Sequence, residues 1–287
     1  KESFKIVVAV GFPSSLLCAI ASIFCSRTLF LYRASYQRSP RVFPIEKRIM
    51  DLMFSRFKRI ICISNFVRLS IVKTFPNTES KAVVIYNGLN ENIVKRIPNY
   101  KFHKNNSEIT YINMGRFVPV KEQNLIINSF ARLIEILPNC RLILLGDGPT
   151  KEDLERDVRE RGLGNKIIFY GHVSDPIKIL LEADIYVHSC RSEGFGISVL
   201  EAMGVGLPII AFNSGALGEI VENNVEGLLV PTDKEHLFFE AMLSLGKDQE
   251  LRKLMGEKAF YRARSSFSIS AARSKYNEIY RNVLSEE

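Results

Sequence analysis

The chain lacks the cysteine patterns that mark zinc sites and disulfide-rich secreted proteins. Its 287 residues contain five cysteines, which are widely spaced and set in apolar runs, without a CxxC pair. Structural zinc sites need closely spaced cysteines, and secreted scaffolds need a dense, paired set. The sequence therefore predicts buried free thiols in a reducing cytoplasm. They are Cys18, Cys25, Cys62, Cys140 and Cys190.

Signatures of metal binding and of repeat architecture are also missing. None of the eight aspartates forms an Asp-x-Asp pair, so we expect no metal ion at the site. The chain has no internal repeat of the solenoid kind and no low-complexity tract. Its 46% apolar and 24% charged residues are typical of a globular protein long enough for one large or two medium domains.

Positive charge is concentrated in the first part of the chain. Residues 1–100 contain 16 Lys and Arg against 5 Asp and Glu, whereas the remainder contains 23 against 26. Such a basic region suits anionic lipid head groups, nucleic acid or an acidic acceptor, and it is equally consistent with an ordinary solvated surface. No nucleic-acid recognition motif accompanies it, so we expect no nucleic-acid partner.

An uncharged stretch of 21 residues, 6–26, lies between Lys5 and Arg27. This length is sufficient to cross a bilayer. The GFPSS sequence near its first third favours a different structure, a buried strand that ends in a loop and is followed by a capped helix. We therefore expect a buried strand and helix here rather than a membrane span.

Apolar strand-like runs alternate with helical patterns along most of the chain, which is typical of βα units around a parallel sheet. Four runs come first, at residues 4–10, 28–34, 59–64 and 82–88. Residues 100–108 are polar and are a plausible linker. Six further runs follow, at residues 109–117, 140–148, 166–172, 184–189, 207–212 and 226–231.

Six such units make a complete doubly wound domain, whereas the first series amounts to about half of one. The pattern therefore predicts an α/β fold with two Rossmann-like parallel-sheet domains that face a cleft. We therefore expect the chain to be a fragment that lacks the amino-terminal portion of its first domain. Ligands of open α/β sheets bind at the carboxyl ends of the strands, so the loops after the second series should carry the chemistry.

The first of these loops, GRFVPVKEQN, places Arg116 and Lys121 around a stiff Val-Pro-Val, just before a helix that begins near Glu122. Two cations beside the positive end of a helix make a seat for a phosphate or diphosphate. The alternative is an exposed basic turn. GDGPTKED, at residues 146–153, lacks the spacing of a phosphate-binding P-loop and is interpreted as a turn and helix start.

YGHV brings His172 to the end of the next strand, where a histidine is more often a packed or surface residue than a catalytic one. The last loop, RSEGFG, places Gly194, Phe195 and Gly196 ahead of a helix that begins at Ile197. Free backbone N–H groups at such a helix start can meet an anion, and glycine permits its close approach.

Two glutamates flank this glycine-rich turn. Glu201 lies one turn into the helix, where its two carboxylate oxygens suit a pair of vicinal hydroxyls, and Glu193 lies at the loop edge. Each glutamate alone would more often be a surface charge. Together, a carboxylate, a diphosphate seat and a second carboxylate match a nucleotide-diphosphate sugar. A nicotinamide site is disfavoured, because Val199 stands where GxGxxG requires its third glycine.

EGFGISVLE resembles the E-x7-E element of the retaining nucleotide-sugar glycosyltransferases of family four, which have the GT-B fold. GRFVPVKEQNLI, LILLGDGP, IIFYGHV and EGLLVPTD follow the carboxyl-terminal domain of that family in order and spacing. IYNGLN resembles its turn into the second domain, and SISAARSKYNEIYRNVL resembles its last helix, which crosses back onto the first domain. The resemblance implies an acceptor-side domain at 1–90 joined by 268–287, and a nucleotide-sugar-binding domain at 91–267.

The same resemblance implies roles for individual residues. Arg116 and Lys121 would bind the donor diphosphate, and Glu193 would contact the transferred sugar. Glu201 would hold the ribose. The remaining donor contacts would be His172 and Val173, bordering the base, and Gly194, Phe195, Gly196 and Ile197, offering backbone amides to sugar and phosphate. No metal and no cofactor beyond the donor would be needed. The glycine-rich loop of the family's first domain and its acceptor-side histidine have no counterpart here.

These observations favour a retaining glycosyltransferase of the hexosyltransferase type, with Glu193, Arg116 and Lys121 at the reaction centre. It would transfer a sugar to a hydroxyl acceptor, free or lipid-linked, in polysaccharide, lipopolysaccharide or glycolipid synthesis. Its expected location is the cytoplasm, with the basic part of the chain docking peripherally at an anionic membrane. The alternative is a truncated, non-catalytic module that binds a nucleotide sugar or serves as a scaffold.

Overall fold

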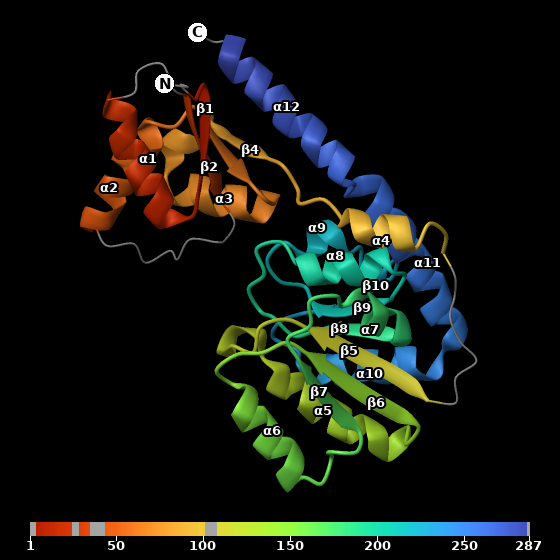
Figure 1. The fold of residues 1–287 in the computed structure, drawn as a ribbon. Coiled ribbons are helices and arrows are strands. Elements are labelled where there is room, and N and C mark those ends of the chain that lie inside the picture. Colours follow the sequence, from red (N-terminus) through yellow and green to blue (C-terminus); the bar gives the residue numbers. More distant parts are fainter. Residues whose placement is uncertain (1–3, 25–28, 35–43, 101–107, 286–287) are drawn as a thin grey trace. The chain divides into compact units, whose positions relative to one another are not determined.

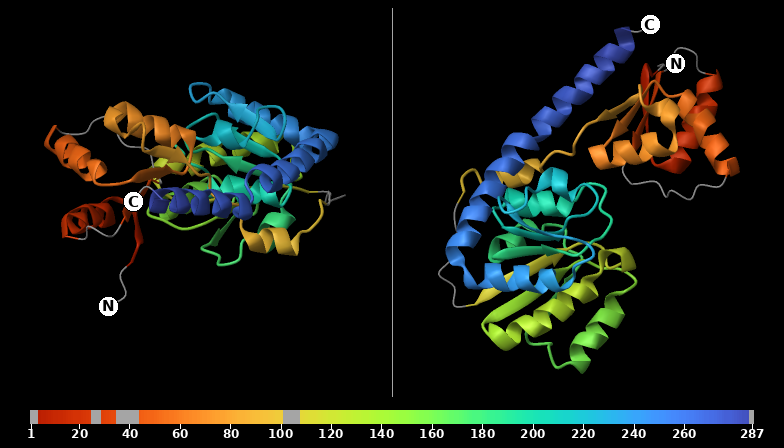
Figure 2. Two further views of the ribbon diagram at one scale, coloured as in Figure 1. Left: turned by 90° about the horizontal axis from the view of Figure 1, so that it is seen from above. Right: turned by 180° about the vertical axis from the view of Figure 1, so that it is seen from behind.

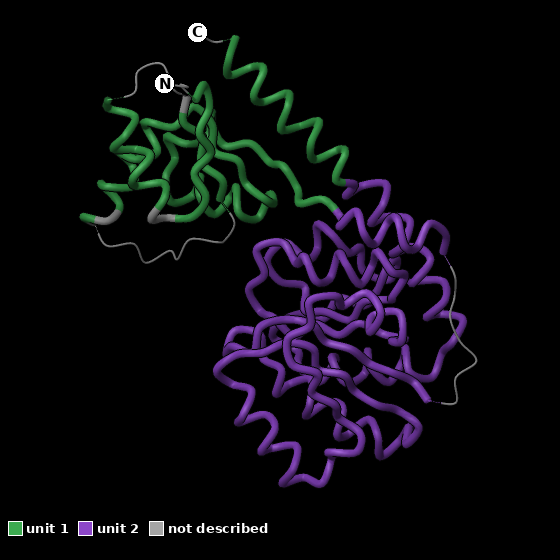
Figure 3. The backbone as a smooth tube through the Cα atoms, in the orientation of Figure 1, with its two compact units in different colours: residues 1–88, 269–287 green, residues 89–268 purple. Residues whose placement is uncertain are grey.

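The computed structural model describes residues 4–24, 29–34, 44–100 and 108–285 (Figure 1). The chain forms two compact units, coloured separately in Figure 3. Unit 1 combines residues 1–88 with 269–287, and unit 2 comprises residues 89–268. The stretch expected to be a linker falls largely on residues 101–107, which lie outside the described residues.

Unit 1 is built on a parallel sheet with the strand order β1-β2-β3-β4. Its strands are β1 (Ile6–Val10), β2 (Leu29–Ala34), β3 (Arg59–Cys62) and β4 (Ala82–Val84). Its helices are α1 (Phe12–Phe24), α2 (Pro44–Ser55), α3 (Asn65–Thr74), the 3-10 turn η1 (Pro76–Thr78) and, from the end of the chain, α12 (Ile269–Ser285). Val283 of α12 is fully buried with Leu31, Ile61 and Ile85, so the last helix contributes to the core of this unit.

The uncharged stretch forms strand β1 and helix α1, as the GFPSS break predicts. Among the residues that the structure describes, no helix has both the length and the apolarity that a bilayer crossing requires. The expected burial is wrong for the end of the strand, where Val10 is 52% exposed, and for the outer face of the helix, where Leu17 is 69% and Phe24 82% exposed. The inner face packs through Ser15 and Ala19. A helix that lies on one sheet buries the side that faces the sheet, whatever the composition of its other side.

Unit 2 contains a six-stranded parallel sheet with the order β10-β9-β8-β5-β6-β7. The strands are β5 (Ile109–Met114), β6 (Cys140–Leu145), β7 (Ile167–Gly171), β8 (Ile185–His188), β9 (Ile209–Phe212) and β10 (Gly227–Val230). Strands β5 and β8 are neighbours, although β6 and β7 separate them along the chain. The direction of winding reverses between them, and open α/β sheets bind ligands at such a point.

Helices cover both faces of this sheet (Figure 2). The helical segments of unit 2 are α4 (Glu91–Arg96), η2 (Pro119–Lys121), α5 (Gln123–Ile136), α6 (Lys151–Glu160), α7 (Ile177–Glu182), α8 (Ile197–Gly204), α9 (Leu217–Ile220), α10 (His236–Lys247) and α11 (Gln249–Ser266). In α5, the buried residues Ile126, Ile127, Phe130 and Leu133 follow the helical period and join the core beneath the sheet. Apolar strands covered on both sides are what the near-continuous hydrophobic runs predict.

All ten strands expected from the sequence are present among the described residues, each within its predicted range. The predicted α/β fold with parallel sheets is therefore confirmed. The strands are shorter than the apolar runs, because several runs continue into loops that contain polar residues or glycine. In unit 2 these loops lie at the carboxyl edge of the sheet, and they form the candidate site.

Candidate functional site

The loops after β5 and β8 meet at the winding reversal and bring together two residues that are far apart in sequence. Lys121 ends the 3-10 turn after β5, and its Nζ lies 2.5 Å from Oε2 of Glu193 in the loop after β8. The same oxygen is 3.1 Å from Nε2 of His188, the last residue of β8. Two groups thus converge on one carboxylate, and one of them, Lys121, lies 72 residues from Glu193 in the sequence.

The Glu193 carboxylate is held in its ionised form. Burial opposes ionisation, but the hydrogen bond from His188 and the charge of Lys121 outweigh it and lower the pKa of Glu193 to about 2. The side chain is only 16% exposed, so solvent screens these interactions weakly. At neutral pH the residue is therefore a fixed negative charge rather than a source of protons.

His188 is almost completely buried, and burial lowers its pKa. Its ring is therefore neutral at pH 7. Because the ionised Glu193 only accepts hydrogen bonds, the ring proton lies on Nε2. Nδ1 then carries a lone pair, and this atom has no hydrogen-bond partner among the described residues.

The loop that carries Glu193 is fixed on one side by the loop after β5. Ser189 Oγ donates to the backbone oxygens of Lys121, at 2.6 Å, and Glu122, at 2.9 Å. The Arg191 guanidinium contacts both carboxylate oxygens of Glu122, at 2.9 and 2.8 Å. Glu122 has a left-handed backbone, with φ of 47°, where the chain turns from η2 into α5. These contacts couple the position of Lys121 to that of Glu193.

The loop after β9 fixes the other side. Gly215 has a φ of 57°, and a Cβ on it would lie 2.0 Å from the backbone oxygen of Glu193. The N–H of Ala216 donates to that oxygen at 2.9 Å. Ser214 Oγ donates to the backbone oxygen of Cys190 at 2.7 Å. Only glycine permits this close approach, so the backbone of Glu193 has little freedom.

The glycine-rich turn leads into α8 as expected. Gly196, with a φ of 97°, precedes the helix and provides no side-chain cap for its first N–H groups. A Cβ on Gly196 would lie 2.8 Å from the Leu217 side chain. The Phe195 side chain is buried against Phe267, so it anchors the turn. Ile197, in contrast, is 55% exposed at the helix start.

A pocket of about 350 Å³ opens at the ends of β5, β6 and β7. Three of the predicted donor-binding residues line it, Arg116, His172 and Val173. Its other lining residues are Met114, Gly115, Leu145, Gly146 and Asp147. The Arg116 side chain is exposed, while its backbone oxygen accepts a hydrogen bond from Gln123 at 3.0 Å, which ties the loop to the start of α5.

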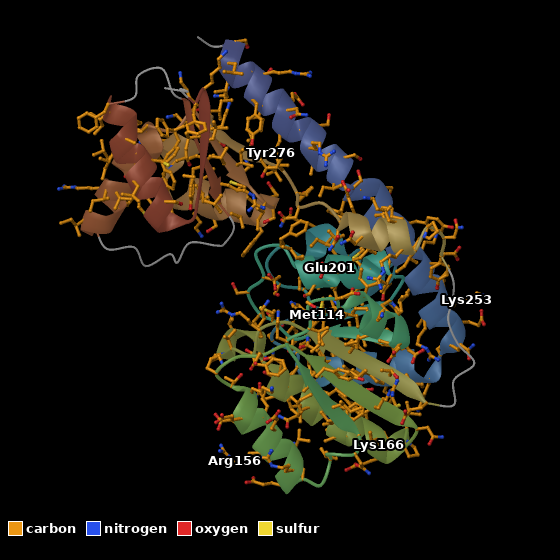
Figure 4. The ribbon with its side chains drawn as sticks, in the orientation of Figure 1. Met114, Arg156, Lys166, Glu201, Lys253 and Tyr276 are labelled. Atoms are coloured by element: carbon orange, nitrogen blue, oxygen red, sulfur yellow. The ribbon has the colours of Figure 1, made fainter. Side chains whose placement is uncertain are left out.

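Glu201 extends from the second turn of α8 and is labelled with Met114 in Figure 4. Burial raises its pKa, and a hydrogen bond from Asn90 opposes this. The Tyr186 hydroxyl donates to the Met114 backbone oxygen at 3.0 Å. Burial raises the pKa of Tyr186, and the charges of Glu193 and Glu201 both act in the same direction. The Tyr186 hydroxyl borders the pocket through Met114.

The structure thus brings Lys121 and Glu193 into contact and gathers Arg116, His172 and Val173 around one pocket on the same sheet edge. Sequence reasoning missed His188. The signal was a polar residue at the carboxyl end of an otherwise apolar strand, DIYVHS, two residues from Cys190 and five from Glu193. Ring nitrogen, thiol and carboxylate oxygen of these three residues lie within 4.8 Å of one another.

Two α/β units built on parallel sheets are the architecture of GT-B glycosyltransferases. Anabaena HepE, solved in complex with UDP and glucose, superimposes with a TM-score of 0.84 over 97% of this chain and 78% of its own, at 21% identity. Residues 97–262 match the family described as Glycosyl transferases group 1. The match covers more than half of the chain, which therefore belongs to the group 1 glycosyltransferase family.

Curated relatives agree with this assignment. A glycosyltransferase of Methanocaldococcus jannaschii is 29% identical over 200 residues, 69% of this chain and 52% of the relative. The Campylobacter jejuni N-acetylgalactosamine-N,N'-diacetylbacillosaminyl-diphospho-undecaprenol 4-alpha-N-acetylgalactosaminyltransferase is 25% identical over 232 residues, 80% of this chain and 62% of the relative. The chain thus spans about half the length of the first and less than two thirds of the second.

Proposed function

We propose that the chain forms the donor-binding part of a retaining, family-four glycosyltransferase that transfers a hexose-type sugar from a nucleotide-diphosphate donor to a hydroxyl acceptor. The observation that carries the proposal is the contact between Lys121 and the ionised Glu193, at the winding reversal and on the same sheet edge as the Arg116 pocket. A cation for the leaving diphosphate and an anion for the sugar are thereby held by one set of interlocked loops.

The chemical step builds negative charge on the departing diphosphate while the sugar becomes oxocarbenium-like. Arg116, Lys121 and the uncapped N–H groups of α8 supply the stabilising positive charge. One such contact, prepared before the reaction, is typically worth about 3 kcal/mol in a site sheltered from water. These groups would replace a metal ion, so we propose that the transfer needs no divalent cation.

Glu193 acts in this proposal by orienting the sugar and by facing the positive charge that develops on it. The carboxylate already accepts from His188 and Lys121, and these contacts make it a weak base and a poor nucleophile. The acceptor hydroxyl would therefore lose its proton to the departing phosphate oxygen. Attack from the same face as the leaving group then retains the anomeric configuration.

The remaining donor contacts follow from the pocket. Glu201, on helix α8 after the glycine-rich turn, would accept hydrogen bonds from the two ribose hydroxyls. The pocket between Arg116 and His172 has room for the diphosphate end and the base, which Val173 would border. Ile197 and the backbone of Gly194 to Gly196 would face the sugar and phosphate.

A lipid-linked acceptor at an anionic membrane suits the basic first part of the chain. The Campylobacter relative carries diphospho-undecaprenol in its name, which supports acceptors of this type. In unit 1, α1 and α2 expose Leu17, Phe24, Ile45 and Leu52. Exposed apolar side chains near Lys and Arg favour peripheral binding, at the cytoplasmic face, to anionic vesicles, and this binding should weaken as salt rises.

A second candidate is a module that binds a nucleotide sugar without turnover, or a scaffold. The observation behind this candidate is the share of the relative that is matched, because the chain spans about half the length of its first curated relative. A panel of nucleotide sugars, each incubated with the chain and with monosaccharide and lipid-linked acceptors, separates the two. Transfer with retained configuration, read by NMR of the product, supports the enzyme. Saturable binding without transfer or donor hydrolysis supports the module.

A further inference from the structure

Two side chains beside Glu193, His188 and Cys190, take no direct part in the proposed transfer reaction. Together with Glu193 they bring a ring nitrogen, a thiol and a carboxylate oxygen within 4.8 Å of one another. His188 is 2% and Cys190 1% exposed, and the Cys190 thiol is free. Ligands around one tetrahedral metal ion lie less than about 4 Å apart, so small side-chain movements would suffice to coordinate an ion.

The backbone around this set is already fixed. Ser189 bonds to the loop after β5, and Ser214 bonds to the backbone oxygen of Cys190. Gly215 and Ala216 hold the backbone of Glu193. A metal ion would therefore bind without having to order the loop, which removes the largest entropic cost of assembling three ligands.

Two of the three ligand side chains have unused bonding capacity. His188 Nδ1 has no hydrogen-bond partner among the described residues, so it can carry the ring proton when Nε2, the nitrogen 3.1 Å from Glu193, binds an ion. The Cys190 thiol has only a 3.3 Å contact with the Ser192 backbone oxygen. A buried histidine nitrogen without a partner is unusual, since buried polar atoms are nearly always paired.

The donor atoms determine which cations fit. Imidazole, thiolate and carboxylate together are ligands for zinc and for similar ions such as cobalt, whereas magnesium and calcium prefer oxygen ligands alone. Three protein ligands leave the fourth position of a tetrahedral ion open to water or a substrate oxygen. Lys121 and Glu193, 24% and 16% exposed, provide the route from solvent.

We propose that His188, Cys190 and Glu193 form a binding site for Zn²⁺, and that Zn²⁺ and the Lys121 ammonium compete for the Glu193 carboxylate. On binding, the Cys190 thiol releases its proton to solvent, and the ring proton of His188 moves from Nε2, which becomes the ligand, to Nδ1. The Lys121 ammonium leaves Glu193, because it now faces a divalent cation. The second part of the proposal rests on the proposed function. With Glu193 bound to the ion and Lys121 displaced, sugar transfer stops, and a chelator restores it.

The direct test is a titration of the full chain with Zn²⁺ in competition with a zinc-sensitive chelating dye, together with the visible spectrum of the Co²⁺ form. We expect one site per chain and a thiolate-to-cobalt absorption band. Loss of partners outside the first ligand shell already costs 10- to 100-fold in affinity, so Cys190→Ser should weaken Zn²⁺ binding by about 100-fold or more. Cys18→Ser, which changes a half-exposed thiol in α1, should leave the affinity unchanged.

A second test removes Lys121, the cation that competes with Zn²⁺ for Glu193. Its result would not be expected if Cys190 had only a structural role. Lys121→Met should tighten Zn²⁺ binding, by about tenfold for each 1.4 kcal/mol of relieved competition. Circular dichroism and thermal unfolding establish that each variant is folded. Equal Zn²⁺ affinities in wild type, Cys190→Ser and Lys121→Met overturn the site, and so does a Co²⁺ spectrum without a thiolate band.

The binding results do not depend on transferase activity, so the two proposals fail separately. If Zn²⁺ binds as expected but no nucleotide sugar is turned over, the site stands and the proposed function falls. If transfer is found and Zn²⁺ at saturating concentration leaves its rate unchanged, the inhibitory part of the inference is overturned. The expected outcome is inhibition of the wild type that Cys190→Ser largely escapes.

Discussion

Replacing Glu193 with glutamine removes one charge and almost no volume, so it isolates the role of the carboxylate. The shift of its pKa from 4.5 to about 2 corresponds to about 3 kcal/mol in favour of the ionised form. Glutamine can still accept hydrogen bonds from His188 and Lys121, but it loses the attraction between a carboxylate and the Lys121 ammonium. Lys121 is 24% exposed and can turn into solvent, so we expect the free energy of unfolding to fall by only about 1 to 3 kcal/mol.

The effect on transfer should be larger than the effect on stability. If the carboxylate orients the sugar and faces its developing charge, Glu193→Gln should lower kcat by roughly 100- to 1,000-fold. The assay is the initial rate of product formation at saturating donor, with urea unfolding measured on the same preparation. Glu235→Gln is the matched control, because Glu235 is exposed and pairs with Arg191 in the same loop system. That variant should keep the wild-type rate.

The role of the carboxylate requires that Glu193→Gln lowers the transfer rate while the protein stays folded, and that Glu235→Gln does not lower the rate. A folded Glu193→Gln protein with near wild-type kcat would refute the role assigned to this carboxylate. A loss of rate in Glu235→Gln as large as that in Glu193→Gln would refute it too, since the effect would then come from loop disorder rather than from the charge beside Lys121.

Three further predictions follow from the same geometry. Gly215→Ala should destabilise the protein by about 1 to 3 kcal/mol more than Gly162→Ala in urea unfolding, because both glycines have positive φ but only Gly215 lacks space for a Cβ; equal losses would contradict the packing argument. The folded-state pKa of Glu193 lies below 4.5, so the stability that its ionised form provides is present above about pH 4.5 and is lost as pH falls toward 2. The urea midpoint of the wild type should therefore approach that of Glu193→Gln over this pH range. A difference in midpoint that stays constant would count against this prediction. Transfer measured in excess EDTA should proceed at the full rate, and complete loss would indicate a metal-dependent mechanism.

The strands could be predicted from sequence because each apolar run ends in glycine or polar residues. Such runs locate the carboxyl ends of the strands, and with them Arg116 and His172, whatever the order of the strands in the sheet. The pairing of Lys121 with Glu193 is different. It exists because β5 and β8 are neighbours, and hydrophobic periodicity does not specify which strands pair.

Two other features were beyond the reach of the sequence pattern for physical reasons. His188 closes an apolar strand, where a buried histidine and a site histidine look the same, and only its distance to Glu193 distinguishes them. Helix α1 carries no charged residue on any side, so its composition does not reveal which face packs. The structure shows that Ala19 lies inward while Leu17 and Phe24 face outward.

The central claim is that one pocket on the unit 2 sheet binds a nucleotide diphosphate through Arg116. The most direct measurement is calorimetric titration of the full chain with UDP, ADP and GDP, repeated with Arg116→Ala and Arg141→Ala. Arg141 lies near the start of β6, at the opposite edge of the same sheet, so its loss changes the net charge equally. The account predicts saturable binding of at least one nucleotide, weakened by roughly tenfold or more in Arg116→Ala alone. Binding that is absent for all three nucleotides, or equally strong in both variants, would contradict it.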